Sequence, residues 1–219
     1  MKIIPKPPYS LELVKELSGL CIENANGFVK DAELLIDAGS YGHSTALSIF
    51  AIEETAKSCL CRLAIDGKIP LEKAWWGAFY AHQAKLSKSF ELFMPLEWAD
   101  AIADFILNVY NSVKGKPIVS GEVETLDSGQ KFLENFRGLL QESSSSNKNI
   151  LDLISEAYHK TRENLTQELD TRRKSGLYVG IDETLNTISP KNVTKSDAQR
   201  FLKLAKQRIK MIGELNTRG

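Results

Sequence analysis

Two acidic residues and a lysine interrupt a stretch that is otherwise apolar and helix-forming. Residues 46–57 read Ala-Leu-Ser-Ile-Phe-Ala-Ile-Glu-Glu-Thr-Ala-Lys, and the charged members are Glu53, Glu54 and Lys57. On a helix, Glu53 and Lys57 share one face with apolar neighbours. Charge in such a place is costly unless it is paired, so its presence indicates a functional site or an interface. Groups of this kind can orient a proton acceptor or hold a phosphate.

Two other interpretations of this cluster compete. Glu53 and Lys57 stand in the favourable i, i+4 order of a simple intrahelical ion pair. A carboxylate-bridged di-metal centre would need a histidine three residues after a glutamate, whereas Lys57 follows Glu54 and Ala56 follows Glu53 at that spacing. Lysine is protonated at neutral pH and does not replace a histidine ligand. We therefore expect no metal and no other cofactor.

His82 and Lys85 are the second set of candidates, in the sequence His-Gln-Ala-Lys. A histidine near its working pKa can move protons, and a lysine one turn further on can hold a phosphate. The competing interpretation is a core histidine whose ring is hydrogen-bonded. We take the other two histidines, His43 and His159, as structural.

The third set ends a later helix. Arg172, Arg173 and Lys174 come just before Gly176, and cations there favour the negative end of the helix dipole. That explains one or two of them, but Arg172 also falls on the predicted apolar stripe of this helix. Tyr178 follows the glycine and can present a hydroxyl group or stack on a base.

The elements that must position these residues are helices. Helical periodicity covers nearly the whole chain, with an irregular segment at about 115–128 and a Ser-rich loop at 143–147. Ser10 is a candidate cap for the first helix and Thr194–Asp197 resembles a capping box for the last. The predicted helices are bounded by residues 10–39, 44–65, 70–95, 98–115, 132–140, 150–176 and 194–212. The predicted core stripe of the first helix is Leu13, Leu17, Leu20, Asn24, Phe28, Ala32 and Leu35.

Composition limits the class of protein. The 219 residues suit one well-cored domain, and we predict a single all-α, mostly antiparallel helical bundle over 1–219. Lys plus Arg equals Asp plus Glu at 28 each, which argues against a general nucleic-acid coat protein. The last helix nevertheless carries five cations with no acid between them, which we predict to be a solvated face, with an RNA-facing role as the alternative. These are Arg200, Lys203, Lys206, Arg208 and Lys210.

The cellular location is predicted from cysteines and hydropathy. Three cysteines without a framework spacing indicate a reducing compartment. The first residues lack the apolar core of a signal peptide, and no run approaches the length that crosses a bilayer. We expect a cytoplasmic protein that does not bind a membrane.

Taken in order, these features resemble one family, the AbiV-type abortive-infection proteins of the HEPN superfamily. The Leu-Tyr-Val that follows a basic helix end makes the combination more specific than the Glu-Glu-x-x-Lys element alone. The resemblance spans most of the chain. The matching segments are 31–35, 51–57, 82–85, 173–179, Pro190 and the last helix from Thr194.

The resemblance implies an antiparallel helical bundle, a homodimer and a role in bacterial defence against phage. Many HEPN proteins are metal-independent ribonucleases that use an Arg-x4–6-His motif across the dimer. No arginine stands at the required distance before His43, His82 or His159. The usual catalytic pair is therefore absent from this chain.

We keep two hypotheses of function. In the catalytic one, His82 takes the proton of an RNA 2′-hydroxyl and Glu53 or Glu54 orients it. Tyr178 positions the phosphate, which is held by Lys57, Lys85 and either Arg172 or Arg173. In the alternative, the same charges only fix the bundle or the dimer, and the protein acts by binding a phage or host component of translation. A nucleotide sensor has no Gly-rich loop to support it.

Overall fold

The described residues confirm the all-α prediction. The computed structural model describes residues 10–71, 85–87, 132, 134–136, 138–139, 150–181 and 187–217. Its helices are α1 (Leu11–Asp37), α2 (Tyr41–Ile65), α6 (Ile150–Leu177) and α7 (Lys195–Thr217). A two-residue antiparallel hairpin, β1 (Gly180–Ile181) with β2 (Thr187–Ile188), and a 3-10 turn, η2 (Pro190–Asn192), connect α6 to α7.

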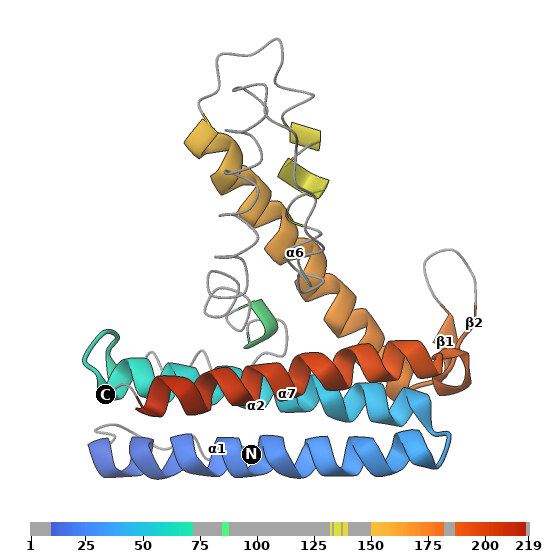
Figure 1. Cartoon of the computed structure of the whole chain (residues 1–219), viewed down its shortest axis with the longest axis horizontal. Coiled ribbons are helices and arrows are strands. Elements are labelled where there is room, and N and C mark those ends of the chain that lie inside the picture. Colours follow the sequence, from blue (N-terminus) through green and yellow to red (C-terminus); the bar gives the residue numbers. More distant parts are fainter. Residues whose placement is uncertain are drawn as a thin grey trace, which may run out of the picture. The chain divides into compact units, whose positions relative to one another are not determined.

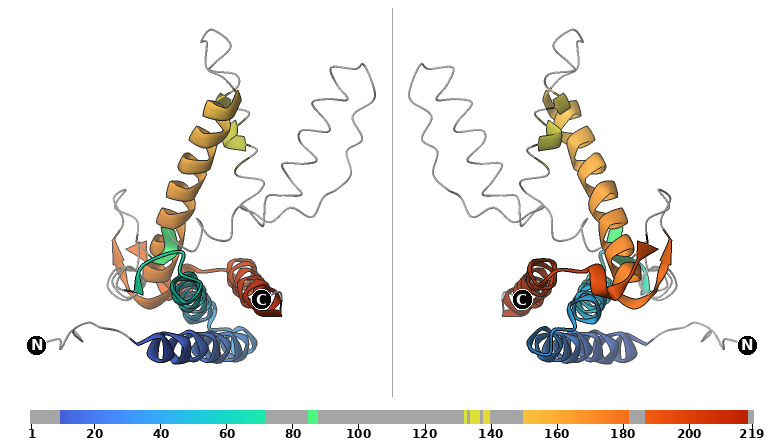
Figure 2. Two further views of the ribbon diagram at one scale, coloured as in Figure 1. Left: turned by 90° about the vertical axis from the view of Figure 1, so that its left-hand side faces the viewer. Right: turned by 90° about the vertical axis from the view of Figure 1, so that its right-hand side faces the viewer.

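The chain divides into two compact units. Residues 1–89 and 167–219 form the first, and residues 90–166 form the second. Within the first unit α1, α2 and α7 run along one another, with α1 antiparallel to the other two (Figure 1). In the end-on views of Figure 2 these three helices lie at the corners of a triangle. The last turns of α6 also belong to this unit.

Local signals set the boundaries of α1 and α2. Ser10 caps α1, where its hydroxyl oxygen accepts a hydrogen bond of 3.1 Å from the amide of Leu13. Gly39 ends it with a φ of 75°, which only glycine adopts readily. The second helix begins at Tyr41 rather than at the predicted Ser44. Ser44 lies inside the first turn of α2, and its hydroxyl donates to the carbonyl oxygen of Ala32 in α1, at 2.8 Å.

The core face of α1 differs from the predicted stripe. Ala32 is buried, but Leu13 and Leu20 are exposed. The buried side of α1 carries small or β-branched residues, which let the backbone of α2 approach closely. Larger leucines would keep the two helices apart, so they stand on a neighbouring face. The buried residues are Val14, Cys21, Ala25, Val29, Ala32 and Ile36.

Helix α2 is the central element of the first unit, because it packs against both α1 and α7. Its buried residues lie on most of its circumference, and several are Ser or Thr. Two of their hydroxyl groups bond within the helix: Ser48 donates to the carbonyl of Ser44 at 2.9 Å, and Thr55 donates to that of Ile52 at 2.7 Å. Ser44 and Ser58 instead bond to residues of α1, and the buried Thr45 hydroxyl has no hydrogen-bond partner among the described residues. Small side chains, most of them hydrogen-bonded within α2 or to α1, therefore let α2 be enclosed.

The start of α7 confirms the predicted capping box. The Thr194 hydroxyl accepts from the amide of Asp197 at 3.1 Å, and Asp197 accepts from the Thr194 amide at 3.3 Å. The buried side of α7 then follows the helical period, and it agrees with most of the predicted stripe. Its buried apolar residues are Ala198, Phe201, Leu202, Ala205 and Ile212.

The described part of the second unit contains the first turns of α6 and a short helical stretch near Phe136. The rings of Phe132 and Phe136 stack at 5.9 Å between centroids. Asn135 donates a hydrogen bond of 2.8 Å to the Thr161 hydroxyl. The predicted third and fourth helices, 70–95 and 98–115, lie almost wholly outside the described residues, as do the segment 115–128 and the loop 143–147.

Two glycines bring α2, α6 and η2 into close contact. A Cβ atom added to Gly42 would lie 2.5 Å from the carbonyl oxygen of Pro190. A Cβ atom on Gly176 would overlap the carbonyl oxygen of Gly42 and reach to 3.2 Å from the Cβ of Ala46. Both obstacles include backbone, which cannot move aside as a flexible side chain would. The approach of α6 to α2 therefore depends on the absence of these side chains.

We expect Gly176→Ala to lower the free energy of unfolding by about 1–3 kcal/mol, because it forces the two helices apart. The matched control is Gly213→Ala in α7, where an added Cβ meets no atom within 4 Å. That variant should gain about 1 kcal/mol through helix propensity. Urea titration of both variants measures the difference, and equal effects would contradict the close approach of α6 and α2.

Candidate functional site

Glu53 is a buried carboxylate that two cations from distant parts of the chain approach. Its Oε2 lies 3.6 Å from Nζ of Lys85, and its Oε1 lies 3.8 Å from Nε of Arg173. Glu53, Lys85 and Arg173 are only 2%, 7% and 8% exposed. Glu53 lies on a side of α2 that is turned away from water and faces the charged groups of Lys85 and Arg173. Charges that are so enclosed persist because they neutralise one another.

Asp170 completes the cluster from within α6. It is buried, and its two carboxylate oxygens each accept a charge-assisted bond of 2.7 Å, from Arg173 and from Lys174. The donors follow Asp170 by three and four residues, so one turn of helix orients them. The guanidinium of Arg173 also lies 6.0 Å from the ring centroid of Phe50. Arg173 is thus held between two carboxylates and an aromatic ring.

Lys85 has a pKa below its usual value. Burial is the main cause, because it disfavours the charged ammonium, and the nearby positive charge of Lys57 acts in the same direction. The carboxylates of Glu53 and Glu54 oppose this shift. A lysine with a lowered pKa gives up its proton more readily, which is a property of many lysines at functional sites.

Glu54 and Lys57 form a second ion pair, which is half-buried beside the first cluster. Burial raises the pKa of the neighbouring Cys21 thiol to about 12, and the Glu54 carboxylate contributes to that increase. Burial likewise raises the pKa of Cys61 to about 11. These thiols are therefore poor nucleophiles near neutral pH. Cys21, Cys59 and Cys61 are all free and buried.

The structure brings together five of the predicted site residues around α2, but not in the predicted pairs. Lys57 is paired with Glu54 rather than with Glu53, because the i, i+3 partner lies closer on this turn. Glu53 is instead paired with Lys85 and Arg173. Sequence reasoning missed Asp170. A usable signal was present, since Asp170 precedes two cations, Arg173 and Lys174, by three and four residues on the same helix.

Arg172 and Tyr178 lie apart from this cluster. The predicted stripe assigned Arg172 to the apolar side of its helix, but Arg173 is the buried residue there. Arg172 is half-exposed and lies 3.8 Å from Asp197 at the start of α7. Tyr178 is 60% exposed beyond the end of α6. His82 lies outside the described residues.

The cations of the last helix do not form one solvated face. Lys203, Lys206 and Lys210 are exposed as predicted, but Arg208 is fully buried. Arg200 donates to Glu168 at 2.9 Å, and Lys206 lies 2.6 Å from Glu33 of α1. The helix therefore uses its cations partly to hold α6 and α1. His43 and His159 are exposed, and His43 shares a 2.9 Å hydrogen bond with Ser40.

Comparison with known families decides the identity of the fold. The family model HEPN_AbiV, described as AbiV, matches residues 13–210. The chain belongs to the AbiV family of HEPN proteins. Membership confirms the resemblance drawn from the sequence, and it implies a role in abortive-infection defence against phage. No curated protein and no solved structure matches this AbiV-family chain significantly.

Two further observations describe this AbiV-family protein. Among the described residues, none of the helices is both long enough and apolar enough to cross a bilayer. Within the same ranges, His, Cys, Asp and Glu side chains do not gather in groups of three that could hold a metal ion.

The buried cluster predicts a large effect of removing the Glu53 charge. We expect Glu53→Gln to lower the free energy of unfolding by about 3–5 kcal/mol, because Lys85 and Arg173 stay buried without their shared carboxylate. The control is Glu33→Gln, which breaks the exposed pair with Lys206 and should cost at most about 1 kcal/mol. Chemical denaturation of the two variants checks this, and similar losses would contradict the role assigned to Glu53.

The lowered pKa of Lys85 predicts how stability changes with pH. The folded protein releases the Lys85 proton at lower pH than the unfolded chain, whose lysine titrates near 10.5. Between those two values the unfolded chain binds more protons, so stability from this group rises with pH. The wild type should therefore gain stability relative to Lys85→Met as pH rises toward 10.5. Unfolding free energies measured from pH 7 to 10.5 test this, and parallel curves would refute it.

Proposed function

We propose that this AbiV-family protein acts in the cytoplasm as a metal-independent ribonuclease that stops translation during phage infection. The observation that carries the proposal is the convergence of Lys85 and Arg173 on Glu53 inside the first unit. Cations and a carboxylate at one place are the groups that phosphoryl-ester cleavage needs. A buried lysine whose pKa is lowered, placed beside a carboxylate, is a candidate marker of a functional site.

The proposed reaction is cleavage of RNA by its own 2′-hydroxyl. A base removes the hydroxyl proton, the oxygen attacks the neighbouring phosphorus, and the 5′-oxygen leaves with a proton. The products are a 2′,3′-cyclic phosphate and a 5′-hydroxyl. We assign phosphate binding to Lys85 and Arg173. His82, three residues before Lys85 in the sequence, is the assigned base.

This mechanism requires that a phosphate of the RNA can reach Lys85 and Arg173. Lys85 and Arg173 are already paired with carboxylates and almost enclosed, so a phosphate must replace Glu53 or Asp170 as their partner. A phosphodiester is an anion of suitable charge for such an exchange. The described arrangement thus corresponds to a closed form of the proposed site, which opens when these ion pairs separate.

The test is cleavage of cellular and phage RNA by the purified protein in the presence of a chelator. We expect products that end in a cyclic phosphate from the wild type and none from His82→Ala or Lys85→Met. Lys203→Met, an exposed lysine of α7, is the matched control and should cut normally. Thermal melting shows whether each variant folds. Absence of cleavage by the wild type, or equal cleavage by all four proteins, would overturn the proposal.

A second candidate function is inhibition of translation by binding alone. The observation that favours it is the near-complete enclosure of Lys85 and Arg173, whose charges are already balanced by Glu53 and Asp170. In this case the cluster only fixes α2 against α6. The protein would then inhibit translation in a cell extract while the extract's RNA stays intact. RNA cleavage that accompanies the inhibition would exclude this candidate.

A further inference from the structure

The two carboxylates beside Arg173 contact it differently. Asp170 accepts a hydrogen bond of 2.7 Å from the Arg173 guanidinium, whereas the Oε1 atom of Glu53 lies 3.8 Å from its Nε. The contact of Glu53 with Lys85 is also long, at 3.6 Å. Hydrogen bonds between ionised nitrogen and oxygen groups are about 2.7–2.9 Å long. Glu53 therefore meets these two cations at a greater distance than Asp170 meets Arg173.

One donor of Arg173 is buried without a hydrogen bond. Its Nε has no hydrogen-bond partner among the described residues, although Arg173 is enclosed. A buried donor that stays unsatisfied destabilises the folded state. An anion that came closer than Glu53 does would satisfy this donor.

The ammonium group of Lys85 is also incompletely compensated. Burial lowers its pKa even though the carboxylates of Glu53 and Glu54 act in the opposite direction, so burial outweighs them. Among the described residues, four cations share three carboxylates in these ion pairs. The cations are Lys57, Lys85, Arg173 and Lys174, and the carboxylates are Glu53, Glu54 and Asp170.

We propose that the Glu53 carboxylate occupies an anion site formed by Lys85 and Arg173, and that a phosphate group binds by displacing it. Glu53 already bridges the two cations with its two separate oxygens. A phosphate has the same charge sign and more oxygens, so it can make the same bridge with shorter contacts. That the ligand is the phosphate of an RNA strand rests on the proposed function, whereas the exchange itself does not.

Glu53 is the carboxylate that leaves, and Asp170 is the one that stays. Asp170 precedes Arg173 by three residues on α6, so their bond does not depend on α2. The ring of Phe50 also lies 6.0 Å from the guanidinium. The displaced carboxylate has another cation within reach, because Lys57 follows Glu53 by four residues on α2. Glu53 therefore competes with the ligand, and Asp170 is a positioning residue.

The first experiment measures phosphate binding to Glu53→Gln, which removes the competing charge and keeps the shape of the side chain. Inorganic phosphate should bind this variant about 10-fold or more tightly than the wild type, because the internal anion no longer occupies the site. Calorimetric titration gives the two dissociation constants. Melting temperatures in phosphate and in chloride of equal ionic strength give a second readout, free of general screening. If the variant unfolds in chloride, phosphate should restore its folding.

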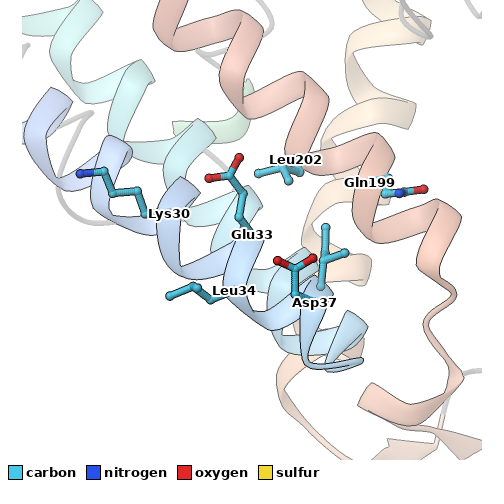
Figure 3. A pocket seen from close by; sticks show the side chains of 7 residues that line it. Lys30, Glu33, Leu34, Asp37, Gln199 and Leu202 are labelled. Carbon is cyan, nitrogen blue, oxygen red and sulfur yellow. The ribbon is translucent and has the colours of Figure 1, made fainter.

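Two matched variants separate binding from the general stabilisation that phosphate gives to folded proteins. Glu33 also pairs with a lysine, but it borders an open groove of about 620 Å³ between α1 and α7 and projects toward α7 (Figure 3). Glu33→Gln should respond to phosphate no more than the wild type. Combining Glu53→Gln with Lys85→Met removes the acid and one of its bases together, and should abolish the additional response.

The proposal would be overturned by equal phosphate responses of Glu53→Gln and Glu33→Gln. A response that persists in full when Lys85→Met is added would also overturn it. Glu53→Asp keeps the charge but shortens the side chain, so its phosphate affinity should fall between those of the wild type and Glu53→Gln. Wild-type affinity in both variants at position 53 would contradict the exchange.

A ligand that cannot be cleaved separates this inference from the proposed ribonuclease activity. A 2′-O-methyl oligonucleotide carries the phosphodiesters of RNA but lacks the attacking hydroxyl. If it displaces phosphate from Glu53→Gln, the site binds a nucleic-acid backbone. If phosphate binds and the oligonucleotide does not displace it, the exchange holds for free phosphate and the assignment to RNA is wrong. Cleavage of RNA by a protein whose position-53 variants bind no additional phosphate would overturn the exchange alone.

Discussion

The first unit depends on one carboxylate placed where water does not reach. Glu53 stands on the central helix and binds a lysine and an arginine that come from two other segments of the chain. Removing three charges from water is expensive, and their mutual attraction offsets much of that cost only at short distance. The positions of α2, of the end of α6 and of residues 85–87 are therefore coupled through a single side chain. Asp170 makes the arrangement tolerable by neutralising the remaining charge on Arg173.

The approach that allows this ion pairing comes from residues with little or no side chain. Gly42 and Gly176 let α6 come against α2, and Ala, Cys and Ser residues let α1 do so on the other side. Hydroxyl groups on α2 bond to its own carbonyls at Ser48 and Thr55 and to α1 at Ser44 and Ser58. Helix α2 is therefore buried because its neighbours approach it closely, and not because it carries large side chains. The same close approach encloses Glu53.

Much of the fold could be predicted from the sequence, because helix caps, glycine turns and hydrophobic periodicity are local signals. They gave the class of fold and the bounds of α1, α6 and α7 to within a few residues. The orientation of helices was harder. On α1 the leucines suggested the core face, yet the smaller residues occupy it, since only packing distance distinguishes the two faces. Lys85 and Arg173 were predicted to share a site with Glu53, but their direct pairing with it was beyond local reasoning, because both come from far along the chain. On α6 the predicted apolar stripe included Arg172, whereas the buried residue of the two candidate arginines is Arg173.

The cluster around Glu53 also constrains how this protein can change over generations. Four side chains share their charges in one enclosed place, so the cost of altering any one of them depends on the other three. A neutral residue at position 53 is tolerable only if Lys85 or Arg173 has already lost its charge. Drift at these four positions should then proceed in concerted steps, through sequences in which acids and bases disappear together. In exposed pairs such as Glu33 with Lys206 the effects of substitutions are not coupled in this way, so each partner can be substituted alone.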